Sequence, residues 1–202
     1  MAESERRTRR AGGRQRRQDV LGHVIEVLVE RGFHQTRFMD VAAASGVAIS
    51  TLQVYFGSRE DMLVEALRAS TEAEVAAMEA QSGGLEDPWD RLVGLIDRGI
   101  ATPVPVWRML MEFWTAAAYD EELREHSHRL QASYRAPFES VLRDGIRGGA
   151  FRTCHDADSI VDLIVTTLDG LLYPKVLGQP RPAGNGLRNL LVDQLRTTLE
   201  VT

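Results

Sequence analysis

Apolar residues recur along almost the whole chain at the spacing of buried helical stripes. Leu21, Val24, Ile25 and Leu28 follow the i, i+3, i+4, i+7 pattern of an amphipathic helix. Later segments repeat this spacing, and no segment shows the strict alternation of a half-buried strand. The pattern predicts an all-α fold of nine helices, at about 20–31, 37–45, 47–55, 59–81, 88–101, 105–118, 120–145, 157–176 and 186–201.

Residues that begin or end helices mark the boundaries in the first third of the chain. Gly32 and Gly46 are placed to end the first and second helices, because glycine adopts the left-handed conformation without strain. Thr36 is placed to cap the second helix. Ser58, with Asp61 three positions later, is an acidic near-match to a capping box and predicts the start of the fourth helix.

The stretch SGGLEDP at 82–88 is the clearest boundary farther along the chain. Asp87 followed by Pro88 is typical of an N-cap and a first helical residue. Pro137 lies inside the seventh predicted helix, which it must kink or split. These boundaries predict a small N-terminal bundle followed by a larger C-terminal one.

The composition is that of an ordinary globular protein, with 202 residues, 44% hydrophobic and 26% charged. No apolar run approaches the ~18 residues that span a bilayer, and the Arg-rich N-terminus lacks the apolar core of a secretory signal. A single cysteine, Cys154, excludes an intramolecular disulfide and supplies no metal cluster. We expect a protein of a reducing cytoplasm with no membrane partner, no metal and no cofactor.

The charge is distributed unevenly along the chain. The net charge is −5, but residues 1–17 carry seven arginines against two glutamates, so this segment is about +5 and the remainder about −10. A basic arm on an acidic body suggests that the arm contacts the phosphates of a nucleic acid. A solubilising tail is the alternative, and either interpretation predicts that residues 1–17 form a disordered arm.

Residues 38–55 fit the register of a DNA-binding helix-turn-helix. If Phe38 is its first position, Ala42 is fifth, where two helices approach closely, and Gly46 is ninth, where the turn needs a positive φ. The fourth, tenth, fifteenth and eighteenth positions, which pack the two helices together, are Val41, Val47, Leu52 and Tyr55. The agreement at all these positions predicts that the third helix enters a DNA groove.

The segment GFHQTRFMDVAAASGVAISTLQVYFGSREDMLVEAL at 32–67 resembles the N-terminal domain of TetR-type transcriptional regulators. The residues that carry the resemblance are Gly32-Phe33, Thr36, Val41-Ala42, Gly46-Val47, Leu52, Phe56 and Ser58-Arg59-Glu60. It implies a two-domain, Ω-shaped homodimer. The domains would be the basic arm at 1–17, a helix-turn-helix domain at 18–65, and a ligand-binding and dimerisation domain at 66–202.

Residues of the arm, the second and third helices and the following turn would contact double-stranded DNA in such a regulator. These are Arg14, Arg16, Arg17, Thr36, Arg37, Ala48, Ile49, Ser50, Thr51, Gln53, Tyr55, Ser58 and Arg59. The third helix departs from the family pattern, which often has Lys-Gly at Ile49-Ser50, Tyr at Gln53 and His at Tyr55. Gln53 can pair with adenine N6 and N7, and Ile49 either meets a thymine methyl or packs.

The stretch WRMLMEFWTAAAYDEEL at 107–123 resembles the C-terminal domain of the choline- and betaine-responsive repressors. That resemblance implies an effector site lined by Trp107, Met111, Phe113, Trp114, Tyr134, Phe138, Leu163, Thr167, Asp169 and Tyr173. Aromatic faces beside the acids Glu112 and Asp169 suit an organic cation, and a neutral hydrophobic effector is the alternative. Core packing alone also accounts for each aromatic residue taken singly.

The resemblance also implies that the eighth and ninth helices form a dimer contact through Ile164, Leu168, Leu171, Leu187, Leu191 and Leu195. The sequence therefore predicts a ligand-responsive repressor that binds a palindromic operator as a homodimer, acts at the nucleoid and is no enzyme. An activator, or a regulator without an effector, is the alternative.

Three other functional classes are disfavoured. A carboxylate-bridged metalloenzyme needs a second Glu-x-x-His motif besides Glu125-x-x-His128, and the sequence has none. A catalytic thiol at Cys154 has only its sequence neighbour His155 as a base, and neighbours seldom face each other. A DNA-coating protein does not need the large apolar C-terminal segment.

Overall fold

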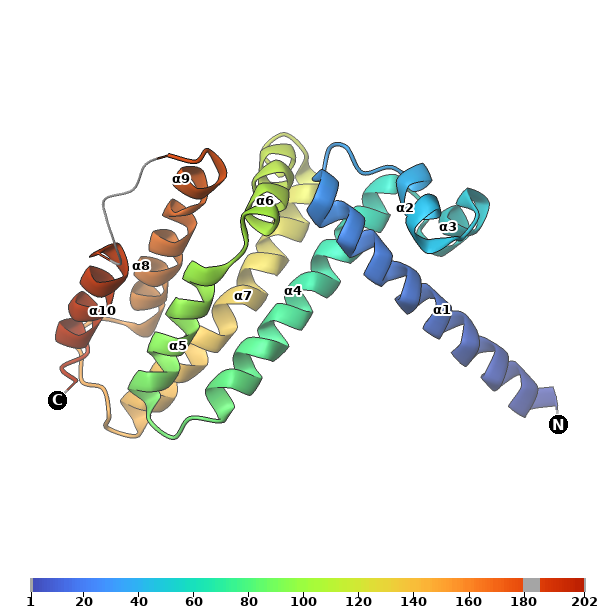
Figure 1. Cartoon of the computed structure of the whole chain (residues 1–202). Helices are drawn as coiled ribbons and strands as arrows, with labels where there is room; N and C mark the ends of the chain where they lie inside the picture. Colours follow the sequence, from blue (N-terminus) through green and yellow to red (C-terminus); the bar gives the residue numbers. More distant parts are fainter. Residues whose placement is uncertain (1, 180–185, 202) are drawn as a thin grey trace. The chain divides into compact units, whose positions relative to one another are not determined.

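The computed structural model describes residues 2–179 and 186–201, and of residues 2–14 it describes the backbone only. The described residues form helices and connecting turns without any strand, which confirms the all-α prediction (Figure 1). The helices are α1 (Ala2–Arg31), α2 (Phe38–Ser45), α3 (Ile49–Phe56), α4 (Arg59–Gly83), α5 (Pro88–Ala101), α6 (Val104–Ala117), α7 (Glu121–Arg147), α8 (Ala157–Gly170), α9 (Leu172–Val176) and α10 (Gly186–Thr198).

The predicted helices correspond to these elements, with three differences. The helix predicted at 157–176 is interrupted at Leu171 and gives α8 and the five-residue α9, so the nine-helix plan holds when these two are taken together. Helix α7 runs through Pro137 without a break, so the proline does not split it.

The third difference concerns the N-terminal arm. Helix α1 begins at Ala2, so the backbone of residues 2–17 is helical where the sequence analysis expected a disordered arm. The arm consists mainly of Arg, Ala, Glu and Gln, which have high helix propensity, and it is continuous with the amphipathic segment that follows.

The helix termini show which local signals were interpreted correctly. Asp87 accepts a hydrogen bond from the backbone N–H of Trp89 at 2.7 Å, as the predicted cap of α5. The carboxylate of Asp61 accepts from the backbone N–H of Ser58, and the Ser58 hydroxyl accepts from that of Asp61. Thr36 does not cap α2, because the N-cap position is Arg37 and the Thr36 hydroxyl donates to the carbonyl of Gly32 instead.

The chain divides into two compact units. Unit 1 consists of residues 1–70 and 108–126, and unit 2 of residues 71–107 and 127–202. The division differs from the domain boundaries expected from the sequence, which assigned all residues beyond 65 to the C-terminal domain. Residues 108–126 belong to unit 1 because the α6 side chain of Phe113 packs against Phe33 in the turn after α1, with ring centroids 5.5 Å apart.

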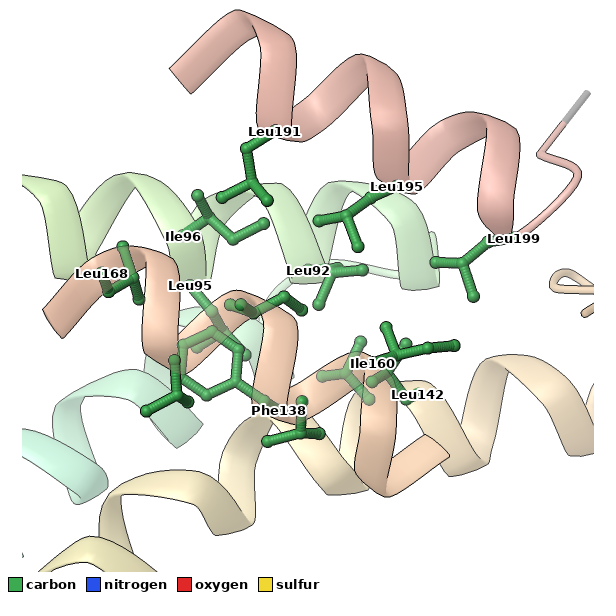
Figure 2. Packing of buried hydrophobic residues seen from close by; sticks show 14 of the residues in the cluster. Leu92, Leu95, Ile96, Phe138, Leu142, Ile160, Leu168, Leu191, Leu195 and Leu199 are labelled. Carbon is green, nitrogen blue, oxygen red and sulfur yellow. The ribbon is translucent and has the colours of Figure 1, made fainter. Parts of the chain in front are cut away.

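Unit 2 is built around one apolar core. Leu92, Leu95 and Ile96 of α5 belong to one cluster with Phe138 and Leu142 of α7 (Figure 2). Figure 2 also shows that side chains from α8 and α10 complete this cluster, among them Ile160, Leu168, Leu191, Leu195 and Leu199. This burial of large apolar side chains from four helices supplies most of the driving force for folding of the unit.

Helices long and apolar enough to cross a bilayer are absent as single elements from the described part of the chain. Among the described helices, α2 and α3 are long and apolar enough only when they are taken together, and the chain bends by 111° at the turn between them.

Candidate nucleic-acid interface and effector site

A tight turn joins α2 to α3. Gly46 has φ +70°, in the left-handed region, and its N–H donates to the carbonyl of Ala42 at 3.0 Å. A side chain at Gly46 would strain the backbone of this turn, although no atom lies within 4 Å of the position that a Cβ would take. The ninth position of the predicted helix-turn-helix therefore has the conformation that the motif requires.

Helix α3 has one buried face and one exposed face. Leu52 and Phe56 are buried and hold the helix against the rest of unit 1. Exposed residues are Ile49, Ser50, Gln53 and Val54, which lie on the opposite side, and Thr51 and Tyr55 border them as half-buried residues. The exposed face thus includes three residues predicted to contact DNA and one, Val54, that the sequence analysis did not single out.

Arg17 of α1 supports α3 from behind. Its Nε donates to the Tyr55 carbonyl at 3.1 Å, and its guanidinium pairs with Glu65 of α4 at 2.5 Å. The same guanidinium lies over the Phe56 ring, 5.3 Å from the centroid. These contacts tie α1, α3 and α4 together, so we reassign Arg17 from DNA contact to positioning of α3.

Arg59 and Thr36 also serve the interior of unit 1. The Arg59 guanidinium donates to the carbonyls of Thr36, at 2.7 Å, and of Phe33, and lies over the Phe33 ring. Burial is the main reason that the pKa of Arg59 is lowered from its ordinary value. Thr36 is completely buried. Both side chains, which the sequence analysis assigned to DNA contact, donate hydrogen bonds to backbone carbonyls within unit 1.

Glu112 of α6 holds the turn between α1 and α2. Its Oε2 accepts a hydrogen bond from the His34 backbone N–H at 3.1 Å. Gly32 has φ +85°, and a Cβ there would lie 2.5 Å from both carboxylate oxygens, so only glycine fits. Glu112 is therefore committed to this turn within unit 1, and we no longer assign it to an effector cation.

The remaining residues predicted to contact DNA lie at the surface of unit 1 wherever their side chains are described. Arg16, Arg37 and Ala48 are exposed, and the side chain of Arg14 lies outside the described residues. Ser58 is exposed but forms the reciprocal cap with Asp61, whose pKa these hydrogen bonds lower.

Unit 2 contains a cluster of polar side chains among its apolar helices. It includes Asp169 of α8, Tyr134 and Gln131 of α7, and the ion pair between Arg98 of α5 and Glu74 of α4, in which Arg98 also donates at 2.8 Å. The pKa of Asp169 is raised, because the effect of burial is larger than that of a hydrogen bond with Gln131, which lowers the pKa. Burial, and then the negative charge of Asp169, raises the pKa of Tyr134.

The cluster is closely packed against α5, and unpaired polar groups lie elsewhere in unit 2. A Cβ on the buried Gly99 of α5 would lie 3.0 Å from the Tyr134 hydroxyl, so the phenol is seated directly on this helix. Elsewhere in unit 2, the indole Nε1 of Trp107 is buried and has no hydrogen-bond partner among the described residues. A buried donor without a partner is costly, and an acceptor group on a bound molecule would relieve that cost.

Two known families match this chain. Residues 25–66 match the tetR family of bacterial regulatory proteins. Residues 91–200, more than half of the chain, match the C-terminal family of BetI-type transcriptional repressors. The chain belongs to the TetR family of bacterial transcriptional regulators. The N-terminal match covers α2 and α3, the helix-turn-helix of this family of transcriptional regulators.

Several known regulators are similar to this chain in sequence or in structure. The HTH-type transcriptional regulator BetI of Rhizobium meliloti (strain 1021) is 27% identical over 166 residues, 77% of this chain and 75% of that protein. A transcriptional regulator from Saccharomonospora viridis, solved in complex with choline, is 24% identical with a TM-score of 0.76, covering 89% of this chain and 95% of that one. FadR from Bacillus subtilis, solved in complex with stearoyl-CoA, is 20% identical with a TM-score of 0.73, covering 88% and 96%.

The effector residues predicted for this TetR regulator are divided between the two units. Phe138 is fully buried in the unit 2 core and Phe113 in unit 1, so both are packing residues. Leu163 and Tyr173 are exposed, and Met111 and Trp114 belong to unit 1. Tyr134 and Asp169 do lie together, while Trp107 and Thr167 stay predictions.

Five of the six residues predicted for the dimer contact are buried within unit 2 itself. Leu187 is exposed, but the other five are buried in the core of unit 2, namely Ile164, Leu168, Leu171, Leu191 and Leu195. The apolar side chains that the same segments expose are instead Leu163, Tyr173, Leu177, Leu187 and Leu190. Helix 157–176 is apolar on several faces, so its sequence did not reveal which one points inward.

Metal-binding geometry is absent from the part of the chain that the structure describes. No three or more His, Cys, Asp or Glu side chains are grouped there so as to hold a metal ion.

Proposed function

We propose that this TetR regulator is a ligand-responsive repressor that binds a palindromic operator as a homodimer and leaves it when a small molecule binds. The observation that carries the DNA-binding part is the exposed face of α3. It presents Gln53 and Ser50 to solvent, while Arg17 and the buried Leu52 fix the helix from behind. A rigid helix with a free polar face after a tight turn is what reading of the major groove requires.

Selection of bound duplexes from a random pool, using the full-length protein, tests this proposal. We expect an inverted repeat to be enriched, with half-sites about 10 base pairs apart or a multiple of that spacing. Enrichment of a single unrepeated site would contradict the dimer, and absence of any enrichment would contradict sequence-specific binding.

For the effector, we propose a site in unit 2 at the cluster of Asp169 and Tyr134. A half-buried carboxylate beside a phenol ring suits an organic cation, and the relative in complex with choline supports this class. A neutral hydrophobic effector is the alternative, which the relative in complex with stearoyl-CoA supports. Trp107 offers an indole donor to an acceptor on either type of ligand.

Calorimetric titration with choline, spermidine and stearoyl-CoA distinguishes the two effector classes. For an organic cation, we expect Asp169→Asn to weaken binding about tenfold or more, because the opposite charge is removed. Asp162→Asn, on the exposed face of the same helix, is the matched control. If only stearoyl-CoA binds, and Asp169→Asn binds it unchanged, the cation proposal is wrong.

The homodimer is proposed to form through the apolar side chains that α8, α9 and α10 leave exposed. Leu190 is 66% exposed and Leu187 48%, which leaves both free to pack against a second copy. Leu190→Glu should therefore give monomers in sedimentation velocity, whereas Leu85→Glu, in the exposed loop before α5, should not. A dimer that persists in Leu190→Glu places the contact elsewhere.

Repression, at the nucleoid of a bacterial cytoplasm, is the final part of the proposal. A reporter gene behind the selected operator should be silenced by the protein. A rise in reporter expression would instead identify an activator.

A further inference from the structure

The reading helix of this regulator is uncharged. Its sequence, ISTLQVYF, contains no Lys, Arg, Asp or Glu. Successive residues of an α-helix are about 100° apart, so Ile49, Gln53, Ser50 and Val54 follow one another around an arc of about 140°. These four residues are exposed, and the buried Leu52 and Phe56 lie outside the arc.

The side chains on this arc restrict which bases α3 can distinguish. Guanine is most often read by Arg or Lys through O6 and N7, and cytosine by Asp or Glu through N4. Helix α3 lacks all four of these residue types. Gln53 suits adenine, Ser50 accepts several bases, and the apolar residues suit the methyl group of thymine.

Two apolar side chains flank the polar pair on this arc. Val54 is 82% exposed and Ile49 42%. Neither contributes to the core of unit 1, and between them lie Gln53 and Ser50. Neighbouring A·T pairs present adenine N6 and N7 and thymine methyl groups in the major groove. A side chain that hydrogen-bonds adenine, flanked by apolar side chains that contact methyl groups, is complementary to these edges.

We propose that Val54 and Ile49 bind the 5-methyl groups of thymines, so that each operator half-site presents A·T base pairs to α3. The proposal rests on the proposed function, because it requires α3 to lie in the major groove. It adds the base composition of the contacted site and assigns a specificity role to Val54.

Replacement of thymine by deoxyuridine removes only the 5-methyl group and so tests the contact directly. The probe is the duplex selected by the full-length protein, with each thymine replaced in turn. At the contacted thymines, we expect affinity to fall about fourfold, the effect of exposing one methyl group to water. The Val54→Ala and Ile49→Ala variants should each bind the thymine-containing duplex more weakly. Each variant should also lose the sensitivity to deoxyuridine at the thymine that the replaced side chain contacts.

Val104→Ala is the matched control, since Val104 is also an exposed valine but lies in unit 2. It should bind as the wild type does and keep the full sensitivity to deoxyuridine. The proposal is overturned if no thymine replacement in the selected duplex changes wild-type affinity, or if the sensitivity persists in both alanine variants. In those cases a selected palindrome would still support the proposed function, whereas failure to select any duplex would overturn both.

Discussion

Two helical glycines show how strongly a single position depends on its surroundings. Gly145 of α7 lies against the buried ring of Phe151, and a Cβ there would be 2.3 Å from a ring carbon. Gly22 of α1 has no atom within 4 Å of the same position. The first glycine is required by packing, and the second only lowers helix propensity.

Opposite effects are therefore expected from the same substitution. Gly145→Ala should lower the free energy of unfolding by about 1–3 kcal/mol, because the buried ring must shift. Gly22→Ala should raise it by about 0.5–1 kcal/mol, because alanine favours the helix. Urea unfolding followed by circular dichroism measures both, and equal effects would show that Phe151 moves without cost.

Gln53 is the residue most directly tied to operator choice. Since it is exposed on α3, Gln53→Ala should leave the unfolding temperature unchanged. It should relax preference at one base pair in each half-site by about 1–3 kcal/mol. Affinities for operators altered at each position in turn provide the measurement. A uniform loss over all of them would make Gln53 a backbone contact instead.

At the level of helices, the turn between α1 and α2 depends on a side chain far away in sequence. Glu112 of α6 accepts from the His34 N–H, and the neighbouring Phe113 packs on Phe33. Removing the acceptor leaves this backbone donor without its partner.

Glu112→Ala should lower the free energy of unfolding by about 1 kcal/mol. Glu112→Gln keeps an acceptor oxygen and should recover much of the loss. Glu122→Ala, an exposed glutamate of α7, is the control and should have almost no effect. Thermal unfolding measures all three, and identical behaviour of the Ala and Gln variants would exclude a role for the hydrogen bond.

The first half of α1 is expected to contact DNA phosphates. A deletion that stops before Arg17 tests this role without removing the contacts that position α3. Deletion of residues 1–15 removes five arginines but keeps Arg16 and the structural Arg17. Operator binding should weaken, while the preference among operators is kept. The slope of log K against log salt concentration should become less steep by about 0.9 for each phosphate that the shortened protein no longer neutralises. Titrations at several salt concentrations test this; an unchanged slope would mean that the arm does not touch DNA.

Local signals were predictable from the sequence and long-range ones were not. The caps at Asp87 and Ser58 and the turn at Gly46 depend on residues within four positions, so the sequence contains all that determines them. The roles of Glu112 and Arg59 depend on partners more than 20 positions away. Both residues are charged and lie next to a predicted functional segment. Their charge alone led the sequence analysis to assign Glu112 to an effector cation and Arg59 to DNA contact.

Over the whole molecule, three helices contribute residues to both compact units. The unit boundaries fall within α4, near the start of α6 and within α7. Each unit contains one proposed site: the face of α3 in unit 1 and the cluster around Asp169 and Tyr134 in unit 2. The Ω-shaped homodimer stays a prediction that solution measurements can test.

Dimeric reading of a palindrome by α3 is the central claim, and a change in operator spacing tests it most directly. Five base pairs inserted at the centre of the selected palindrome rotate one half-site by about half a turn relative to the other. Affinity measured by fluorescence anisotropy should then fall to that of unrelated DNA, by about a thousandfold or more. An affinity unchanged by the insertion would contradict dimeric reading, because each half-site would then be bound independently.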